Sequence, residues 1–451
     1  MPKVLIAGGG LVGALNACFF AKRGWDVEVF DIRMDIRKME HVPGRSINLA
    51  LSQRGKASLD AVGLKDYIAN SGVQMFARLV HDIDGKTYHR QDYGQPGEHI
   101  ISINRRHLNE IMITEAEKFD KVNFNFKHKI IKADIKNKEL HVHDLNTDQI
   151  HKIKGDLILA CDGAHSAVRR SLTALPHFNY SQKYIEHGYV ELNILPKNND
   201  YALEPNVFHL WPRGDFTLIA LANRDKTFTV TIFAPFKLFN EQMYDDQSVL
   251  NFFQKYFPDA YELLGDDHIK ETFNRMKPQT LLDIKCSPHS FGDCILLTGD
   301  AAHAMVPFYG QGMNCGFEDC LVLSKLLDEF KDDIPKTLAA YTERRVKDCH
   351  TINDLAMYNY NELKDLVNKW GYKIRKKFDL KMNKYFPKFW IPLYSMVSFT
   401  QIPYSEVVKK RAWQDNIISK SQKIISIIGA ITIGAIIIRK NQLIKNIFNK
   451  P

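Results

Sequence analysis

The sequence predicts an α/β fold: a Rossmann-like dinucleotide-binding domain with an inserted β-rich domain, then a C-terminal helical region and a membrane-anchor helix. Three patterns indicate it. The apolar run at residues 4–7 ends in glycines, and a helical stretch (11–22) and a second strand (26–31) follow, which is a βαβ opening. Several segments within residues 189–233 alternate apolar and polar side chains, as in an antiparallel sheet. Helical periodicity begins near residue 317, and an apolar run occupies residues 424–438.

The composition is that of a globular protein with a basic tail. Its 451 residues are 45% hydrophobic and 25% charged, which suits two or three compact units. The net charge is +9, but the segment from residue 401 onwards has nine Lys or Arg against two acidic residues and so carries +7 of it. Without a zinc spacing or an Arg-rich helix, this charge predicts no nucleic-acid partner. Seven scattered cysteines without a C-x-x-C pair indicate a reducing compartment and no metal site, and the N-terminus predicts no signal peptide.

The glycine-rich turn after the first strand predicts dinucleotide binding. Gly8, Gly10 and Gly13 fit the pattern G-x-G-x-x-G. In this pattern the first glycine allows the tight turn, the second lets the backbone approach a pyrophosphate, and the third lets helix and strand pack closely. Asp31 ends the second strand, where a carboxylate can bind a ribose. A purely structural turn is the alternative, but strand, helix, strand and acid follow in the order that binding requires.

Two later motifs decide which dinucleotide is expected. Residues 161–169 (CDGAHSAVR) contain D-G-x-x-S-x-V-R, and residues 298–303 (TGDAAH) lead into a second glycine-rich loop. Together the three motifs resemble the FAD-dependent aromatic hydroxylases, the family of para-hydroxybenzoate hydroxylase. The resemblance implies that the D-G motif serves both FAD and NADPH and that Asp300 holds the ribityl-phosphate part of FAD. A helix N-cap is the alternative for Asp300. The residues expected at the flavin pyrimidine edge, where a helix begins, are Gly312, Met313 and Asn314.

A longer string, GRSINLALSQRG at residues 44–55, narrows the resemblance to the kynurenine 3-monooxygenases. Residues 252–260, 317–321, 357–360 and 391–397 support it. It implies L-kynurenine as the substrate, bound through Arg78, Tyr93, Asn359 and Tyr394. A guanidinium suits the amino-acid head because it binds a carboxylate with two parallel hydrogen bonds. A surface ion pair is the alternative for Arg78.

The same resemblance adds residues on the cofactor side. Arg105, at the start of a helical stretch, could reach the pyrophosphate, and its neighbour Arg106 is the alternative. Pro307, Phe308 and Tyr309 are expected to wall the pocket beside the flavin. The further cofactor contacts that the resemblance implies are Val12, Arg33, Ala50, Ile130 and Ala167.

The implied reaction needs no catalytic side chain. NADPH reduces FAD, and a flavin C4a-hydroperoxide formed with O2 hydroxylates the ring of kynurenine to give 3-hydroxykynurenine. No second G-x-G-x-x-G is present, so the nicotinamide is expected to visit the flavin without a domain of its own. Two alternatives stay open: another FAD monooxygenase with a lipophilic substrate, and a non-catalytic flavin-binding membrane scaffold.

The apolar run at residues 424–438 (IISIIGAITIGAIII) predicts a C-terminal membrane anchor. It has no polar face, and Lys423, Arg439 and Lys440 flank it. As a helix it spans roughly 22 Å, against about 30 Å for a bilayer core, a gap that snorkelling basic side chains can close. A buried packing helix or an interfacial helix is the alternative. A short anchor with basic flanks suits the mitochondrial outer membrane with the catalytic part facing the cytosol, and the resemblance points there too.

The predicted domains are discontinuous because the motifs are far apart in the chain. The FAD-binding domain is assigned to residues 1–70, 100–180 and 288–345, and the β-rich substrate domain to residues 71–99 and 181–287. The C-terminal helical region takes residues 346–415, and the basic-flanked anchor takes residues 421–451.

Overall fold

A six-stranded, mainly parallel sheet carries the glycine-rich turn. The computed structural model describes residues 1–40, 48–364 and 370–448, so residues 44–47 of the string above and residues 449–451 of the expected anchor lie outside it. The strand order is β18-β19-β12-β1-β2-β8, with the first strand of the chain, β1, inside the sheet. The strands expected at residues 4–7 and 26–31 are confirmed. The six are β1 (Lys3–Ala7), β2 (Asp26–Asp31), β8 (Val122–Phe126), β12 (Leu157–Ala160), β18 (Ser290–Phe291) and β19 (Ile295–Leu297).

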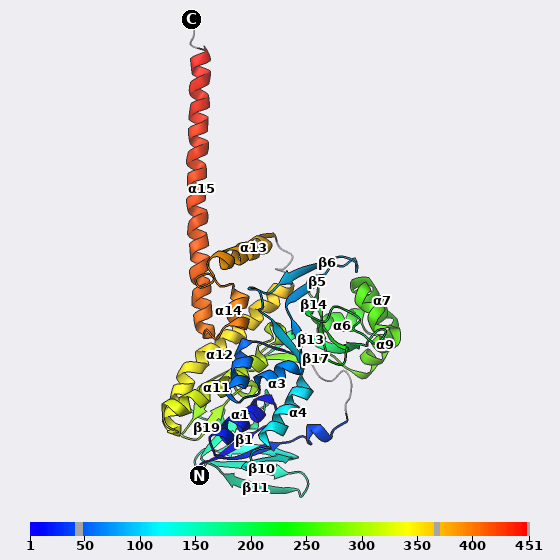
Figure 1. Ribbon diagram of the computed structural model, residues 1–451, viewed down its shortest axis with the longest axis vertical. Coiled ribbons are helices and arrows are strands. Elements are labelled where there is room, and N and C mark those ends of the chain that lie inside the picture. Colours follow the sequence, from blue (N-terminus) through cyan, green and yellow to red (C-terminus); the bar gives the residue numbers. More distant parts are fainter. Residues whose placement is uncertain (41–47, 365–369, 449–451) are drawn as a thin grey trace.

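Two different layers cover the faces of this sheet. Val4 and Ile6 of β1 pack into a core to which several helices contribute, three of them named below (Figure 1). Leu5 and Ala7 point the other way, into a core with a short helix and a three-stranded sheet. All four side chains are fully buried, which is why this strand is an unbroken apolar run. The helices are α1 (Leu11–Lys22), α4 (Arg105–Ala116) and α11 (Gly312–Glu329) on the first face and α5 (Ala167–Leu172) on the second, with β9 (His128–Asp134), β10 (Glu139–Asp144) and β11 (Gln149–Lys154).

A seven-stranded sheet, in the order β17-β13-β16-β15-β14-β5-β6, forms the second part of the molecule. The alternating segments between residues 189 and 233 all lie in it, so these strands are confirmed. Parallel pairing of β5 with β14 places Arg78 beside Phe208. Its strands are β5 (Ala77–His81), β6 (Tyr88–Asp92), β13 (Asn179–Ile194), β14 (Val207–Pro212), β15 (Thr217–Ala222), β16 (Phe228–Pro235) and β17 (Gln279–Ser287).

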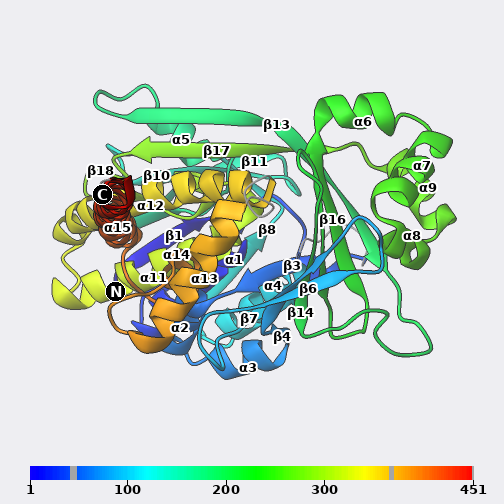
Figure 2. The same ribbon diagram turned by 90° about the horizontal axis from the view of Figure 1, so that it is seen from above.

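Four helices cover the outer end of this sheet, and the sequence reading of a β-rich domain overlooked them (Figure 2). One signal was available: Asp245 and Ser248 form a capping box, in which each side chain bonds the other residue's backbone N–H. Pro258 at a helix start was another. The helices are α6 (Phe236–Gln242), α7 (Asp246–Tyr256), α8 (Pro258–Leu264) and α9 (Asp266–Arg275).

A small antiparallel sheet, β3-β7-β4, lies between the two large ones. Asn48 at the start of β3 donates to Asn223 (2.7 Å) and to Ser102 (3.1 Å), and so links the small sheet to the end of β15. These elements are β3 (Asn48–Leu51), β4 (Val73–Met75), β7 (Ile100–Asn104), the 3-10 turn η1 (Ile36–Lys38), and the helices α2 (Gln53–Ala61) and α3 (Lys65–Asn70).

The C-terminal part is helical, as expected from residue 317 onwards, although its first long helix, α11, already begins at Gly312. The last helix leaves the body and runs away from it (Figure 1). Within the described residues, no helix combines the length and the apolar character that a membrane crossing requires. The elements are α10 (Asp300–His303), η2 (Pro307–Tyr309), α12 (Ile334–Lys364), α13 (Trp370–Tyr385), α14 (Leu393–Phe399) and α15 (Tyr404–Phe448).

A buried carboxylate, Asp319, ties the start of α11 to its surroundings. One of its oxygens accepts from the backbone N–H of Gly299 (2.9 Å) and pairs with His303 (2.6 Å), and the other accepts from Arg345 of α12 (2.7 Å). Burial alone would raise the pKa of Asp319, but the charges of His303 and Arg345 lower it well below its usual range. His303 is thus a packed structural histidine.

The network continues from Arg345 towards the last helices. Arg345 pairs with Glu318 (2.8 Å), which also pairs with Arg54 of α2 (2.6 Å). Arg54 donates to the carbonyl oxygen of Val397 (3.1 Å) and lies 3.8 Å above the ring of Tyr404. These bonds join α2, α11, α12, α14 and α15, which surround the second glycine-rich loop.

We predict that Arg345→Ala lowers the free energy of unfolding by about 3–5 kcal/mol, because it leaves the buried carboxylate of Asp319 without its guanidinium and Glu318 with Arg54 as its remaining cation. The neighbouring Arg344→Ala is the matched control. Arg344 forms an exposed pair with Glu329, and its loss should cost less than about 1 kcal/mol. Denaturant unfolding of both variants measures the difference, and similar losses would show that the network does not stabilise the fold.

Gly13→Ala should disrupt the first turn. A methyl group there would lie 1.9 Å from the carbonyl oxygen of Gly8, which is backbone and has little room to move. We expect a loss of stability of about 1–3 kcal/mol or more and purification without bound flavin. Gly371→Ala in α13 is the control, since its added methyl group would meet nothing within 4 Å. A Gly13→Ala protein with full flavin content would contradict the close-packing role.

Candidate active site

A cavity of about 640 Å³ is lined by residues of all four sheets and of all three cofactor motifs. That volume is typical of sites for a cofactor and a small substrate. Most of the residues expected from the sequence line it. They are Gly8, Gly10, Val12, Asp31, Arg33, Ala50, Arg78, Tyr93, Arg105, Ile130, Ala167, Asp300, Gly312, Met313 and Tyr394.

At one end of the cavity, Asp31 organises the glycine-rich turn. One oxygen accepts from the backbone N–H of Gly9 (2.8 Å), and the guanidinium of Arg33 binds both oxygens (3.0 and 2.8 Å). Burial opposes ionisation, but Arg33 and the backbone N–H groups lower the pKa of Asp31 below its ordinary value. The carboxylate is therefore charged and held at the cavity wall, where it can also accept from a ribose.

The start of α1 offers free backbone donors at the same end. Gly10 is the N-cap residue, and no side chain caps the helix. A methyl group on Gly10 would approach only the Arg33 guanidinium, at 3.9 Å, so the backbone is open to a ligand. Uncapped N–H groups with the positive end of the helix dipole suit a pyrophosphate. The donor set therefore fits the expected FAD.

Helix α11 presents a second free N-terminus to the cavity, beside β3. Asn314 does not line the cavity but positions the backbone segments that do. Its side chain accepts from the N–H of Ser52 and donates to the carbonyl oxygens of Ala50 and Gly310, each at 2.8 Å. Gly310 has a left-handed φ of 64°, which turns the chain into the helix.

Asp300 lines the cavity between these two helix starts. The residue that caps α10 is Gly299, with a φ of 57°, and no side-chain capping bond is formed. The alternative that Asp300 serves as an N-cap is therefore not supported. Its exposed carboxylate remains the proposed contact for the ribityl part of FAD.

The opposite end of the cavity is cationic and aromatic. Arg78, half-buried on β5, places its guanidinium carbon 4.4 Å from the centre of the Tyr394 ring. Tyr394 stacks near Tyr93 (5.5 Å) and Tyr309 (5.8 Å). Burial, and then the nearby Tyr394, raise the pKa of Tyr93 well above its ordinary value, so its hydroxyl keeps its proton. A retained cation with a neutral hydroxyl can receive a carboxylate.

Apolar walls complete this end, and the sequence pointed to only part of them. Phe308 was expected and packs 5.0 Å from Phe233, ring centre to ring centre. The strand residues were missed: Phe208, Ile219, Leu221 and Phe233 also line the cavity. Alternation identified their strands but not which face turns towards the cofactor.

Three of the expected residues do not line the cavity: Gly13, Asn314 and Asn359. Gly13 lies under the turn. Asn359, almost fully buried, donates to the carbonyl oxygen of Phe308 (2.7 Å), so it positions the wall.

Two neighbouring arginines, Arg105 and Arg106, have different surroundings in the structure. Arg105 is exposed and lines the cavity. Arg106 binds Glu110 (2.7 Å) and the carbonyl oxygens of residues near η1, including Ile36 (2.8 Å). Arg106 is thus a structural residue, and Arg105 stays the proposed pyrophosphate contact.

Comparison with known proteins agrees with this geometry. Residues 1–354 match the family of FAD binding domains. A solved structure of 2-methyl-3-hydroxypyridine-5-carboxylic acid oxygenase has the same fold, with a TM-score of 0.68 and 18% identity over 81% of this chain and 93% of the other. PqsL from Pseudomonas aeruginosa, solved with 2-aminobenzoylacetate, reaches a TM-score of 0.66 at 19% identity, over 81% of this chain and 97% of the other.

Sequence relatives are much closer. Kynurenine 3-monooxygenase of Caenorhabditis briggsae is 64% identical over 95% of this chain and 97% of its own length. That of Caenorhabditis elegans is 64% identical over 93% and 94%, and that of Sus scrofa is 45% identical over 92% and 88%. The chain therefore belongs to the kynurenine 3-monooxygenase family.

Proposed function

We propose that this protein is an FAD-dependent monooxygenase that converts L-kynurenine to 3-hydroxykynurenine with NADPH and O2. The observation that carries the proposal is that Arg78, a cation inside the molecule, faces the same cavity as the three cofactor motifs. An amino-acid carboxylate on Arg78 would extend the ring of the substrate towards the flavin position.

Different residues of the chain would contact different parts of the FAD molecule. The starts of α1 and α11 would hold the pyrophosphate and the pyrimidine edge of FAD, and Asp31 and Asp300 would provide carboxylates for the ribose and the ribityl chain. When bound, FAD accepts hydride from NADPH and activates O2. Gly312 and Met313 would place N–H donors beside the flavin ring, where a helix N-terminus favours negative charge.

The end of the cavity that contains Arg78 would bind the substrate and exclude water from its reacting ring. Arg78 and the hydroxyl of Tyr93 bind the carboxylate, and the ring of Tyr394 supports the guanidinium from one side. The apolar walls exclude water from the flavin. The amino group of kynurenine already donates electrons to its ring, so no side chain needs to act as a strong base.

A lipophilic substrate fits this end poorly. It would take the Arg78 guanidinium out of water without supplying a carboxylate in exchange, and desolvating a charge is costly. A carboxylate-bearing substrate supplies that anion.

Arg78→Ala should raise the KM for kynurenine by on the order of 10²-fold, because a bond to a charged group contributes about 1.5–3 kcal/mol. Flavin content should not change. Arg90→Ala on the neighbouring strand β6 is the control, since Arg90 is exposed and pairs with Asp92 and Glu204. Kynurenine-stimulated NADPH oxidation measures KM, and an unchanged value for Arg78→Ala would remove kynurenine as the substrate.

We also propose that helix α15 attaches the protein to a membrane, the mitochondrial outer membrane, with the catalytic part facing the cytosol. Its described isoleucines are exposed, including Ile433 (61%) and Ile436 (61%), because this part of the helix extends away from the body (Figure 1). Exposed apolar side chains on every side of a helix favour burial in lipid. The run is short, so the basic residues at its ends would reach the headgroups.

Deleting residues 421–451 should abolish co-sedimentation with neutral phosphatidylcholine vesicles and leave kynurenine-stimulated NADPH oxidation intact, because the cavity lies in the body. The full chain is the control. If the shortened protein sediments with neutral vesicles as the full chain does, the anchor lies elsewhere.

A further inference from the structure

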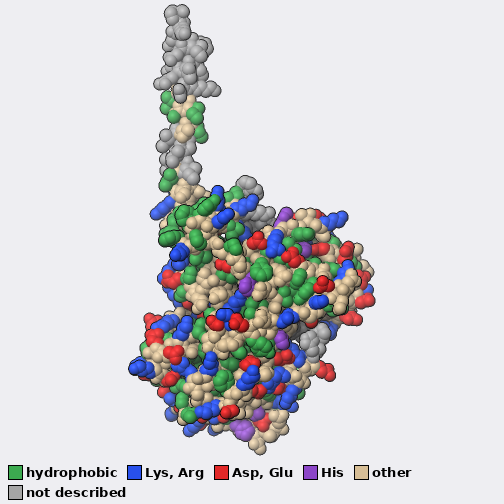
Figure 3. All heavy atoms as spheres, viewed as in Figure 1, with side chains coloured by type: hydrophobic (Ala, Val, Ile, Leu, Met, Phe, Trp, Pro, Cys, Tyr) green, Lys and Arg blue, Asp and Glu red, His purple; other side chains and the backbone are tan. Residues whose placement is uncertain are grey.

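The outer face of α13 and of the turn after it, residues 374–389, exposes large apolar and basic side chains together. We call it the α13 face. Phe389 is 77% exposed and Phe386 is 53% exposed, which is unusual for phenylalanine in a water-soluble region. Figure 3 shows apolar and basic side chains interspersed beside the base of α15. The exposed members are Ile374, Lys377, Phe378, Lys381, Lys384, Tyr385, Phe386, Lys388 and Phe389.

This face has no exposed acid. The only acidic residue in the sequence of residues 370–389 is Asp379, which is buried on the opposite side of the helix. Its oxygens accept from Arg375 (3.0 Å), Arg411 of α15 (2.9 Å) and the indole of Trp390 (2.9 Å). These bonds fix α13 to the base of α15. Because Asp379 binds these partners on the inner side, no acidic residue of α13 offsets the positive charge of the lysines on the outer face.

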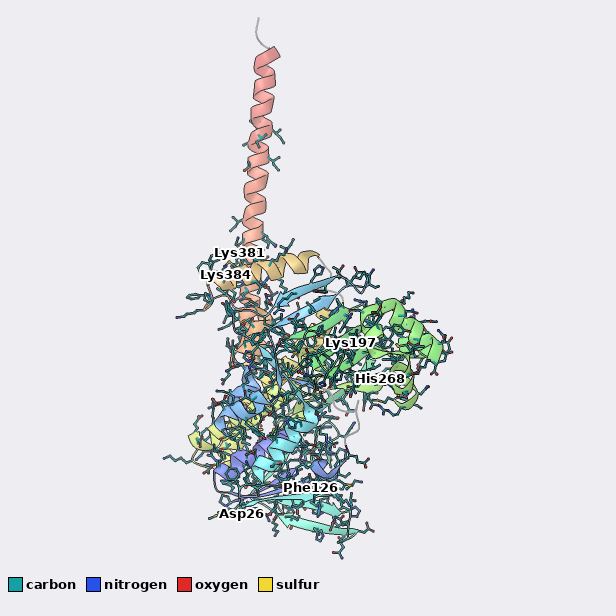
Figure 4. The ribbon with its side chains drawn as sticks, turned by 45° about the vertical axis from the view of Figure 1, so that its right-hand side comes forward. Asp26, Phe126, Lys197, His268, Lys381 and Lys384 are labelled. Atoms are coloured by element: carbon teal, nitrogen blue, oxygen red, sulfur yellow. The ribbon has the colours of Figure 1, made fainter. Side chains whose placement is uncertain are left out.

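The α13 face lies where α15 leaves the body. Helix α13 crosses beside the base of α15, and Lys381 and Lys384 lie at that level (Figure 4). Trp413 of α15 is half exposed and lies 6.0 Å from Trp390, ring centre to ring centre. From Ile417 to the start of the apolar run at Ile424 the helix rises roughly 10 Å. That distance is comparable with the headgroup layer plus the reach of a side chain.

We propose that the α13 face binds the surface of an anionic lipid bilayer, with its aromatic side chains among the headgroups and its lysines on the phosphates. The proposal rests on the membrane attachment through α15, which it deepens: one helix inserts, and a second lies flat beside it and fixes the orientation of the catalytic body. Aromatic and basic side chains on one surface are typical of interfacial helices. A second copy of the chain would instead bring lysines against lysines.

A fluorescent probe on the full chain tests the proposal. Phe389→Cys carries a polarity-sensitive thiol dye; the natural cysteines are buried except Cys161, which is half-buried. With vesicles that contain phosphatidylserine, we expect blue-shifted emission and quenching by brominated lipid. Ile436→Cys reports the anchor in the same way. Tyr244→Cys, exposed on the far domain, should stay in water.

A second experiment reverses the charge of three lysines on the α13 face. Lys381→Glu, Lys384→Glu and Lys388→Glu together should abolish the Phe389 signal and leave the Ile436 signal, since each lysine near an anionic surface strengthens binding roughly fivefold. The matched control reverses three exposed lysines of the β-rich domain, Lys197, Lys237 and Lys277, and should change neither signal.

The outcomes separate the two proposals. Quenching at Ile436 with Phe389 in water would overturn the α13 face and leave the anchor standing. Both probes in water would overturn both proposals. A Phe389 blue shift that depends on protein concentration and not on lipid would show self-association and overturn the bilayer as the partner.

Discussion

Asp319 is the residue on which the geometry of the cofactor cavity depends most. It is fully buried and charged, and it holds the backbone of Gly299, the ring of His303 and the guanidinium of Arg345 at hydrogen-bond distance. The turn at Gly299 precedes Asp300, and the helix that carries Asp319 begins at the second glycine-rich loop. A buried charge has low energy only when its partners stay in place. The two cofactor elements are therefore fixed relative to each other before any cofactor binds.

The cavity itself separates charge from apolar surface. Helix N-termini and carboxylates lie at the dinucleotide end, and Arg78 with stacked tyrosines lies at the other. Aromatic and aliphatic side chains from the seven-stranded sheet lie between them. Such a site would suit a flat substrate with an anionic head and would keep water from the flavin, as proposed above. The family membership and this arrangement support the same chemistry independently.

Much of this could be predicted from the sequence, because the motifs are local. The order of strand, glycines, helix and acid predicted β1, α1 and β2, and the three motifs predicted that Gly10, Asp300 and Gly312 share one site. Long-range facts could not be predicted in this way. Whether Phe208 or its neighbour faces the cavity depends on the pairing of β14 with β5, and the bond from Asn359 to Phe308 depends on how α12 crosses the loop. The helices between residues 236 and 275 were not predicted, although the capping box at Asp245 was visible in the sequence.

The central claim is that a cationic pocket and a flavin site act on one amino-acid substrate. Mass spectrometry of the product formed by purified protein from kynurenine, NADPH and ¹⁸O2 tests it most directly. The expected product is 3-hydroxykynurenine with one labelled oxygen atom on the ring. Oxidation of NADPH that leaves kynurenine unchanged, or a product with oxygen derived from water, would contradict the account.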